Sequence, residues 1–370
     1  MAITHSTPAD ASMSEAGKAA WNADHTGTWP ASDVTFTQSG SGASSRTVSA
    51  KLQEHPSIED YSSAGGVADQ IQKAIDANVG KIVIARSSSY AVDAPVDFDD
   101  DSWLIGQGIS GTTFTKSFNG ASDSQGIFNI KSGASGTIIE GATLRGGTGT
   151  TGGCLISNVA VLGAAADACV LRDLWLTTQG SDTQTYTLYW DGSARSGAPL
   201  GIRDNTFVNV HVFGAATAAA RIHSVIRLNW IGGGIAAAGG TSGKLILSGT
   251  AGVVTTNCSI NVGVISNGVD ALDLDRVTNS TIIVGNLGNV ANTNTVTDVK
   301  IMAGAVGTVE TDWLRSWVEL PGTVYFGTGA PSFNARQGAL YLRSDGSSTS
   351  TRAYINSDGG TTWVAVTTAS

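Results

Sequence analysis

The sequence predicts an all-β solenoid of short strands stacked rung on rung, and three observations lead to this prediction. The 370-residue chain contains 47 glycines and only 14% charged residues, against about a quarter in an average protein. Short apolar runs recur from residue 137 onward. Finally, "TTNCSINVGV" (255–264) and "VTNSTIIVGN" (277–286) share one pattern 22 positions apart. A fixed step is the mark of a repeat architecture. The matched pairs are Asn257 with Asn279, Ile260 with Ile282, Val262 with Val284 and Gly263 with Gly285.

The first 114 residues contain a polar segment, one helix and the first strands. Residues 1–60 are polar and poorly periodic, except that "DVTFTQSG" (33–40) alternates apolar and polar residues like a strand. A helix that caps the solenoid is expected at 66–79, because Gly80 follows a stripe of apolar residues. That stripe comprises Val67, Ile71, Ala74, Ile75 and Val79. "KIVIA" (81–85) and "SWLIGQGISGTTF" (102–114) then predict strands.

The rung pattern extends upstream of residue 255. Asn205 is expected to take the place of Asn257, and Asp173 to open an earlier rung, because Asn and Asp tolerate left-handed backbone. The inward residues of these rungs would be Val208, Val210 and Val212, then Ile226, Leu228 and Trp230; Asn209, His211, Arg227 and Asn229 would point outward. The stretch 177–201 is expected to be a long loop between rungs, and loops of that length are often functional.

From about residue 321 the pattern changes. Strands that contain Tyr, Phe, Leu and Trp alternate there with "SDG" and "DGG" turns. This composition predicts a separate small β domain at 321–370.

Three stretches carry a family resemblance. They are "WNADHT" (21–26), the segment 34–92 that includes the helix, and "GTGAPSFNARQGALYLRSDGSSTSTRAYINSDGGTTWVAV" (327–366). They resemble bacteriophage tailspike or tail fibre proteins with a pectate-lyase-like right-handed parallel β-helix. Two motifs depart from the family: its "GDGVTDD" is "AGGVAD" here and its "FPAGTY" is "ARSSSY", so we expect a shortened first turn.

The resemblance implies a domain plan and an assembly. Residues 1–60 would attach to a phage tail or other virion protein, 61–320 would form the right-handed parallel β-helix, and 321–370 would form the tip. The family is homotrimeric, so we expect a homotrimer located on the virion, with the β-helix directed at the host.

Composition excludes several other classes. The net charge is −9 without a basic cluster, so nucleic acid is not an expected partner. Neither a signal peptide nor an apolar stretch of about 18 residues is present, so a soluble protein made in the host cytoplasm, without membrane insertion, is expected. No CxxC pair occurs, and neither a metal nor a cofactor is expected. The three cysteines, expected to be buried thiols, are Cys154, Cys169 and Cys258.

Catalytic candidates are carboxylates, because cleavage of a glycosidic bond by hydrolysis needs an acid and a base or nucleophile. The candidates on the solenoid are Glu140, Asp173, Asp191, Asp204, Asp273 and Asp275. Asp191 and Asp204 flank the long loop and form the first pair to consider. The competing interpretation is structural, since aspartate at the start of a rung makes the turn and Asp273 with Asp275 forms a solvated face.

Candidates for sugar binding lie in "YTLYWDGSAR" (186–195). Flat aromatic rings cover sugar rings, and charged groups bond hydroxyls. Packing of these aromatics onto the solenoid or a neighbouring subunit explains them equally well. The candidates are Tyr186, Tyr189, Trp190 and Arg195. His211 and His223 are expected to lie in outer polar ladders.

Two functions remain open from the sequence. The first is a structural, receptor-binding spike that holds host surface polysaccharide without cleaving it. The alternative is a depolymerase, either an endoglycosidase or a lyase, that degrades capsule or O-antigen on the same scaffold. The fold alone does not distinguish these two functions. The scarcity of carboxylates on the repeats favours the receptor-binding spike.

Overall fold

The computed structural model describes residues 35–37, 45–47, 55–62, 64–161, 167–178, 183–193, 201–237, 243–250, 252–266, 271–288, 290–292, 296–306, 324–335 and 337–367. The chain separates into two compact units, Met1–His55 and Pro56–Ser370. In the first unit, β1 (Thr35–Thr37) pairs antiparallel with β2 (Ser45–Thr47). The strand predicted in "DVTFTQSG" is therefore confirmed.

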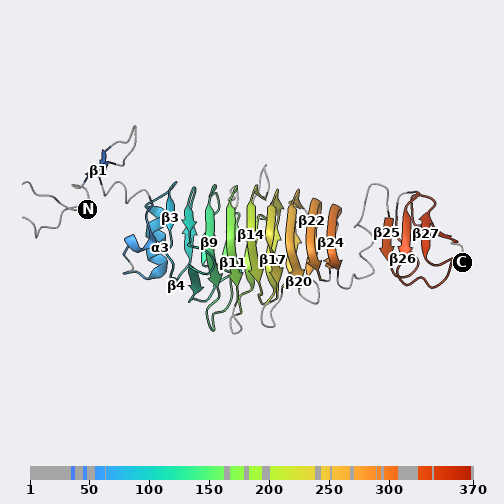
Figure 1. Cartoon of the computed structure of the whole chain (residues 1–370), viewed down its shortest axis with the longest axis horizontal. Helices are drawn as coiled ribbons and strands as arrows, with labels where there is room; N and C mark the ends of the chain where they lie inside the picture. The colour runs from blue at the N-terminus through green and yellow to red at the C-terminus, as the bar shows by residue number, and fades with distance from the viewer. Residues whose placement is uncertain are drawn as a thin grey trace, which may run out of the picture. The chain divides into compact units, whose positions relative to one another are not determined.

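A helix covers the first coil of the second unit (Figure 1). The short 3-10 helix η1 (Ile58–Asp60) precedes α3 (Val67–Asp76), which buries Ile71 and Ile75. The side chain of Gln72 accepts a hydrogen bond from Asp97 N (2.7 Å) and donates one to Asp97 O (2.9 Å). Gln72 thus provides hydrogen-bond partners for both backbone groups of Asp97, which lies on the edge strand of the first coil. The helix is shorter than predicted, and Val79 lies beyond its end and is exposed. No helix among the described residues is long and apolar enough to span a membrane.

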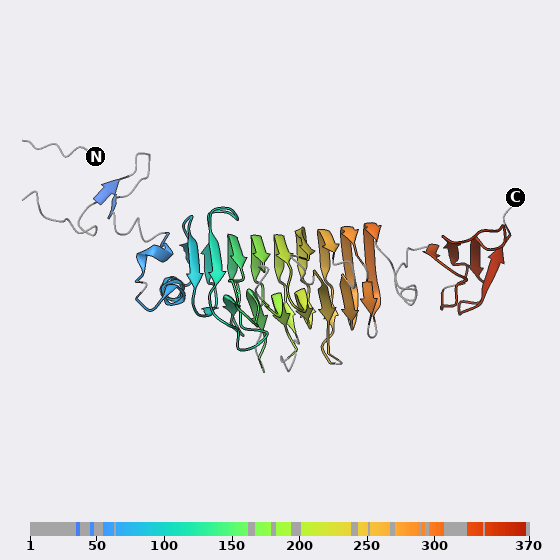
Figure 2. The ribbon, with the colours of Figure 1, turned by 90° about the horizontal axis from the view of Figure 1, so that it is seen from below.

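The solenoid consists of two long sheets in which neighbouring strands run parallel (Figures 1 and 2). Parallel pairing between successive coils defines a parallel β-helix, as the sequence predicts. One sheet contains β5 (Val96–Phe98), β8 (Phe128–Ile130), β10 (Ile156–Val159), β12 (Tyr186–Asp191), β15 (Ala218–His223), β18 (Leu245–Ser248), β21 (Leu272–Asp275) and β23 (Val290–Asn292). The other contains β3 (Ile82–Ile84), β4 (Ser89–Val92), β6 (Trp103–Ile105), β7 (Thr113–Lys116), β9 (Ile138–Arg145), β11 (Val170–Thr177), β13 (Ile202–Arg203), β14 (Thr206–Phe213), β16 (Val225–Ile226), β17 (Asn229–Ala236), β19 (Thr255–Thr256), β20 (Ser259–Ser266), β22 (Val277–Leu287) and β24 (Thr297–Val306).

One residue of left-handed backbone recurs at the same place in successive coils. It stands two residues before the aligned positions of the long strands, with φ between 45° and 70°. Asn and Asp occupy most of these places because they accept this conformation at low cost. The series is Asp101, Gly136, Ala168, Asp204, Arg227, Asn257, Asn279 and Asp298.

This series confirms part of the predicted register and corrects the rest. Ile260 pairs with Ile282 and Val262 with Val284, as the 22-residue step predicts. Upstream, the turn residue is Asp204, not Asn205, and Phe207 instead of Val208 occupies the inward place. Asp204 and Asn205 are both suitable for a left-handed turn, and the structure places the turn at the first of them. Ile226 is only half-buried, whereas Leu228 and Trp230 are buried.

A second left-handed position bends the long strands in their middle. Asp173 (φ 50°) and Asn209 (φ 53°) stand opposite each other there, and Gly141 and Gly232 take the same place in adjacent strands. Asp173 therefore lies within β11 and does not open a rung, which corrects the prediction. The bend therefore divides each of these strands into two segments whose outer surfaces face different directions.

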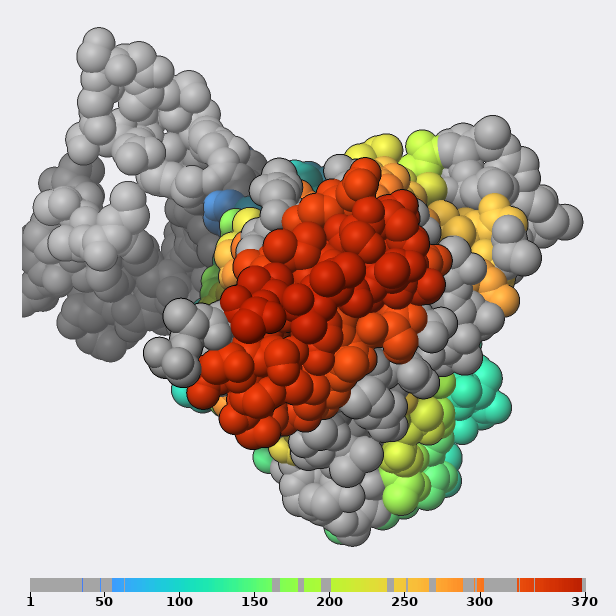
Figure 3. Space-filling model, turned by 90° about the vertical axis from the view of Figure 1, so that its right-hand side faces the viewer, coloured from blue at the N-terminus to red at the C-terminus, as the bar shows by residue number. Residues whose placement is uncertain are grey.

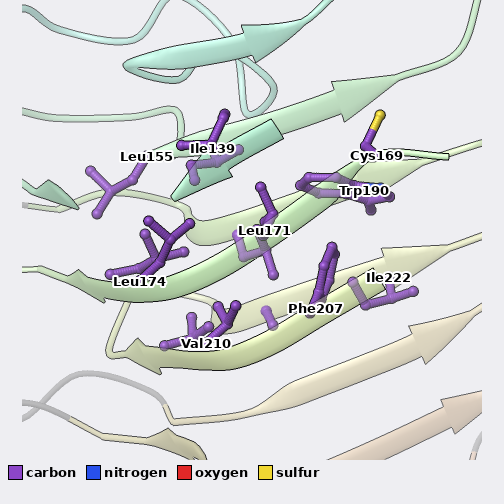
Figure 4. Packing of buried hydrophobic residues seen from close by; sticks show 14 of the residues in the cluster. Ile139, Leu155, Cys169, Leu171, Leu174, Trp190, Phe207, Val210 and Ile222 are labelled. Carbon is purple, nitrogen blue, oxygen red and sulfur yellow. The ribbon is translucent and has the colours of Figure 1, made fainter. Parts of the chain in front are cut away.

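The core is a set of apolar rows that run through successive coils. Trp190 and Trp230 pack edge-on against Phe207, with ring centroids 5.1 and 5.3 Å apart. Figure 4 shows Trp190, Phe207 and Ile222 pointing into the space between the two sheets. Full burial of each large apolar side chain stabilises the fold by about 1.5–3 kcal/mol. The three cysteines are buried free thiols, as predicted.

The C-terminal residues form a four-stranded sheet, β25 (Val324–Gly327), β26 (Leu340–Arg343), β27 (Ala353–Asn356) and β28 (Trp363–Val366), whose surface is red in Figure 3. Its own small core contains Tyr325, Phe333 and Tyr341, with Tyr354 and Trp363 packed against them.

Candidate functional site

The outer face of the eight-stranded sheet gathers aromatic and polar side chains from successive rungs. Parallel pairing places Arg221 opposite Tyr189, and His223 opposite Asp191. On the next rung Ser248 lies opposite His223. We call this set the tyrosine–arginine cluster; it comprises Tyr186, Tyr189, Asp191, Arg221, His223 and Ser248.

Arg221 is held against two tyrosine rings. Its guanidinium carbon lies 5.8 Å from the ring centroid of Tyr186 and 5.4 Å from that of Tyr189. Its Nη1 donates a hydrogen bond of 3.4 Å to the Tyr186 hydroxyl. The tyrosines are only 6% and 8% exposed, whereas Arg221 is half-buried. The rings therefore position the guanidinium, and Arg221 keeps part of its surface exposed.

Asp191 is oriented by two donors. The Tyr189 hydroxyl donates to its Oδ2 at 3.0 Å, and Ser193 N donates to its Oδ1 at 2.9 Å. Burial, followed by the charge of Asp191, raises the pKa of Tyr189 well above its usual value. Tyr189 consequently keeps its proton and remains a donor at neutral pH.

His223 sits between the carboxylate and a hydroxyl. Its Nδ1 is 2.6 Å from Ser248 Oγ, and burial lowers its pKa, with the charge of Asp191 acting in the opposite direction. The imidazole is therefore neutral at pH 7. A neutral imidazole, a protonated phenol and a carboxylate thus share one strand pair, and this set is suited to proton transfer as well as to binding hydroxyls.

The other candidate carboxylates have cation or amide partners. Asp273 Oδ2 lies 3.0 Å from Lys244 Nζ, and Asp275 Oδ2 lies 3.1 Å from Arg276 Nη1. Glu140 pairs with Arg172, and Asp173 accepts a hydrogen bond of 2.7 Å from Asn209. In the described part of the chain, no group of three or more His, Cys, Asp and Glu side chains is arranged to hold a metal.

Asp204 does not join the cluster. It lies in the turn before β14, where Arg227 Nε and Nη2 donate to its two oxygens at 2.5 and 2.6 Å. The hydrogen bonds from Arg227 lower the pKa of Asp204. The structure thus gives Asp191 and Asp204 separate partners, and the turn explains Asp204 without a catalytic role.

The predicted sugar-binding residues have different fates. Tyr186 and Tyr189 lie in the cluster, but Trp190 is fully buried, which corrects its expected place on the surface. Alternation along β12 sends Leu188 and Trp190 inward while Tyr189 and Asp191 point outward. Arg195 lies outside the described residues.

Sequence reasoning missed Arg221 and Ser248. The alternation in "ARIHS" (220–224) is a usable signal, because it places Arg221 on the same face as His223. Ser248 carries no such signal, since only pairing between β15 and β18 brings it to His223.

No protein-family model and no curated protein sequence matched the chain. Solved structures with a similar fold include bacteriophage CBA120 tailspike protein 3, at 12% identity and a TM-score of 0.31 over 96% of this chain and 77% of that one. The enzymatically active domain of CBA120 tailspike protein 2 has 14% identity and a TM-score of 0.41 over 84% of this chain and 52% of that one. The A-module of Azotobacter vinelandii mannuronan C-5 epimerase AlgE4 has 13% identity and a TM-score of 0.41 over 68% and 76%. The expected likeness to phage tailspikes is confirmed, and what these chains share is the fold.

Proposed function

We propose that this chain is a spike protein of a bacteriophage virion whose β-helix binds a polysaccharide of the host cell surface. It acts as a homotrimer, with residues 1–60 bound to the phage tail or another virion protein and residues 321–370 at the tip. The observation that carries the proposal is the tyrosine–arginine cluster.

The cluster has the properties that a sugar site requires. Arg221 supplies hydrogen-bond donors and Asp191 supplies acceptors, and a sugar hydroxyl uses both. Both groups are already held by Tyr186 and Tyr189, so little side-chain freedom is lost when a glycan binds. A few fixed polar groups set among aromatic rings are typical of small-ligand sites.

Cleavage of the bound glycan is the second candidate function, and the pairing of Asp191 with His223 favours it. Among cleavage reactions, elimination suits the cluster better than hydrolysis. Asp191 and Asp275 are separated by three strand steps. At about 4.8 Å a step this is about 14 Å, more than the ~9.5 Å limit for paired carboxylates. In an elimination, neutral His223 would accept a proton, Tyr189 would protonate the leaving oxygen, and Arg221 would stabilise the anion that forms between these steps.

The test uses the purified protein and surface polysaccharide extracted from the host. Binding is measured by isothermal titration calorimetry for the wild type, for Arg221→Met and for the matched control Arg172→Met. We expect Arg221→Met to weaken binding by about tenfold or more, since it removes a charged donor, and Arg172→Met to leave binding unchanged. Wild-type affinity in a folded Arg221→Met variant would refute this site, and lack of binding by the wild type would refute the function.

Product analysis separates the two candidate functions. Binding without new reducing ends supports a receptor-binding spike. New reducing ends with the ultraviolet absorbance of unsaturated sugars indicate a lyase, and ends without that absorbance indicate a hydrolase. Light scattering tests the trimer, for which three times the mass of one chain is expected; the mass of a single chain would contradict it.

A further inference from the structure

A second aromatic feature lies on the long sheet, apart from the tyrosine–arginine cluster. Trp175 on β11 and both His211 and Phe213 on β14 are partly exposed on its outer face. Trp175 stands opposite His211 in the strand register. Neither Trp175 nor Phe213 is used by the proposed site.

The three rings form two layers. His211 and Phe213, two residues apart on one strand, have ring planes within 6° of each other and centroids 6.2 Å apart, so they lie side by side. Trp175 covers one side of this pair, with centroids 5.1 Å from His211 and 4.6 Å from Phe213. The indole therefore supports both rings from one side only.

The opposite side of the ring pair lacks large side chains. The next strand, β17, places Gly234 opposite His211 and Ala236 opposite Phe213. One strand further, Val264 leans towards Gly234, since a Cβ built on Gly234 would lie 2.8 Å from Val264 Cγ1. We call this arrangement the aromatic step; it comprises Trp175, His211, Phe213, Gly234 and Ala236.

The two rings differ in how far they are covered. Gly234, opposite His211, is buried, because Val264 covers it. Ala236, opposite Phe213, is partly exposed and carries only a methyl group. The accessible face of the step is therefore that of Phe213 beside Ala236, where a sugar ring would contact the phenyl ring at about 3.5–4.0 Å.

The rings are held in place before any ligand arrives. His211 Nε2 lies 3.1 Å from Asn209 Oδ1, and Asn209 Nδ2 donates to Asp173 Oδ1 at 2.7 Å. Asp173 and Asn209 are left-handed residues of the bend that are not glycine. Such backbone is costly for most residues and is often found at ligand sites. Burial lowers the pKa of His211, so its ring is uncharged at neutral pH.

We propose that the aromatic step is a second carbohydrate site, which stacks the C–H face of a neutral hexopyranose on the open face of Phe213, with Trp175 behind that ring and His211 beside it. Aromatic faces carry partial negative charge and attract the partly positive axial hydrogens of a sugar. The step itself contains no charged side chain, which favours a neutral sugar with one apolar face, such as a glucose- or galactose-type ring. This inference rests on the proposed glycan-binding function and adds the sugar class to it.

The direct test is saturation-transfer difference NMR on the full-length protein with methyl β-D-glucopyranoside as the probe. We expect the ring hydrogens of one sugar face to receive most of the saturation in the wild type. Ala236→Leu should remove this effect, because a leucine side chain would cover Phe213 without offering an aromatic face of its own. Ala237→Leu, an identical change at the exposed neighbouring residue, should leave the effect unchanged. Absence of saturation in the wild type, or persistence in Ala236→Leu, would overturn the inference.

Host polysaccharide then separates this inference from the proposed function. Loss of affinity of about tenfold in both Ala236→Leu and Arg221→Met supports two sites on one chain. Loss in Arg221→Met alone overturns the aromatic step and leaves the proposed function intact. Lack of binding by the wild type overturns the proposed function, while the monosaccharide experiment still decides whether the step binds sugar.

Discussion

Replacement of Lys116 by methionine should destabilise the β-helix strongly. Lys116 is fully buried at the end of β7, and its ammonium donates to Gln184 Oε1 at 2.7 Å and to Gly152 O at 2.9 Å. Gln125 O and Cys154 O each lie 3.4 Å away. One side chain thus joins segments from three coils.

The magnitude follows from the two short hydrogen bonds. A hydrogen bond to a charged group contributes about 1.5–3 kcal/mol, so the pair contributes about 3–6 kcal/mol. Methionine avoids the desolvation of an ammonium but leaves the buried carbonyls without their donor. Since the avoided desolvation offsets part of this sum, we expect the free energy of unfolding to fall by about 3–5 kcal/mol. Binding of polysaccharide should weaken too, because Cys154 packs against Tyr186 and Tyr189.

Urea titration followed by tryptophan fluorescence measures this change, since Trp190 and Trp230 are buried in the solenoid core. Lys131→Met is the control: Lys131 is exposed and pairs with Asp99 at 3.4 Å, so its loss should cost less than about 1 kcal/mol. Gln184→Leu should be coupled to Lys116→Met by about 1 kcal/mol or more in a double-mutant cycle. A loss below about 1 kcal/mol in Lys116→Met would refute the reasoning.

Three further predictions concern backbone, pH and thiols. Ala168 and Asn279 both have left-handed backbone, which glycine adopts easily and valine does not. In urea titrations, Ala168→Gly should therefore stabilise the β-helix by up to about 1 kcal/mol, and Asn279→Val should destabilise it by about 1–2 kcal/mol. Equal effects of the two changes would contradict this explanation. Burial lowers the pKa values of His211 and His223, so their stabilising contribution is complete above the unfolded pKa of about 6.5 and is lost as pH falls below it. The melting temperature should therefore fall between about pH 7 and about pH 5, and less so when both residues are Asn. Burial raises the pKa of two of the three cysteines to about 12 and of the third to about 11, so a thiol reagent should modify none before urea is added and all three afterwards.

The register of the solenoid was predictable where successive rungs follow each other without interruption. Ile260 and Ile282 are neighbours because no residue is inserted between their rungs. Upstream, Val212 matches Ile265 through Ile235, and both lie equally far along the chain from their turns at Asp204 and Asn257. Unbroken alternation of Val208, Val210 and Val212 instead predicts the turn at Asn205, because it does not allow for the bend at Asn209. Such a bend changes which side chains face inward, and alternation alone does not reveal it.

The candidate site was predictable in part for a similar reason. The sequence pointed to "YTLYWD" but placed it in a long loop, whereas the structure makes it strand β12. The order of inward and outward residues in that strand decides that Tyr189 and not Trp190 faces outward. Arg221 and Phe213 have ordinary sequence surroundings. Their roles depend on which strands lie beside them.

The sequence by itself determined the architecture of this protein, because a short repeat of apolar residues and turn-forming Asn, Asp and Gly has few ways to bury its apolar side other than by stacking. Tertiary structure alone decided the chemistry of the surface. Residues more than 20 positions apart, such as Asp191 and His223 or Trp175 and His211, become neighbours through parallel pairing. Loops of unequal length between rungs set that pairing, and a single sequence contains no local pattern that specifies it.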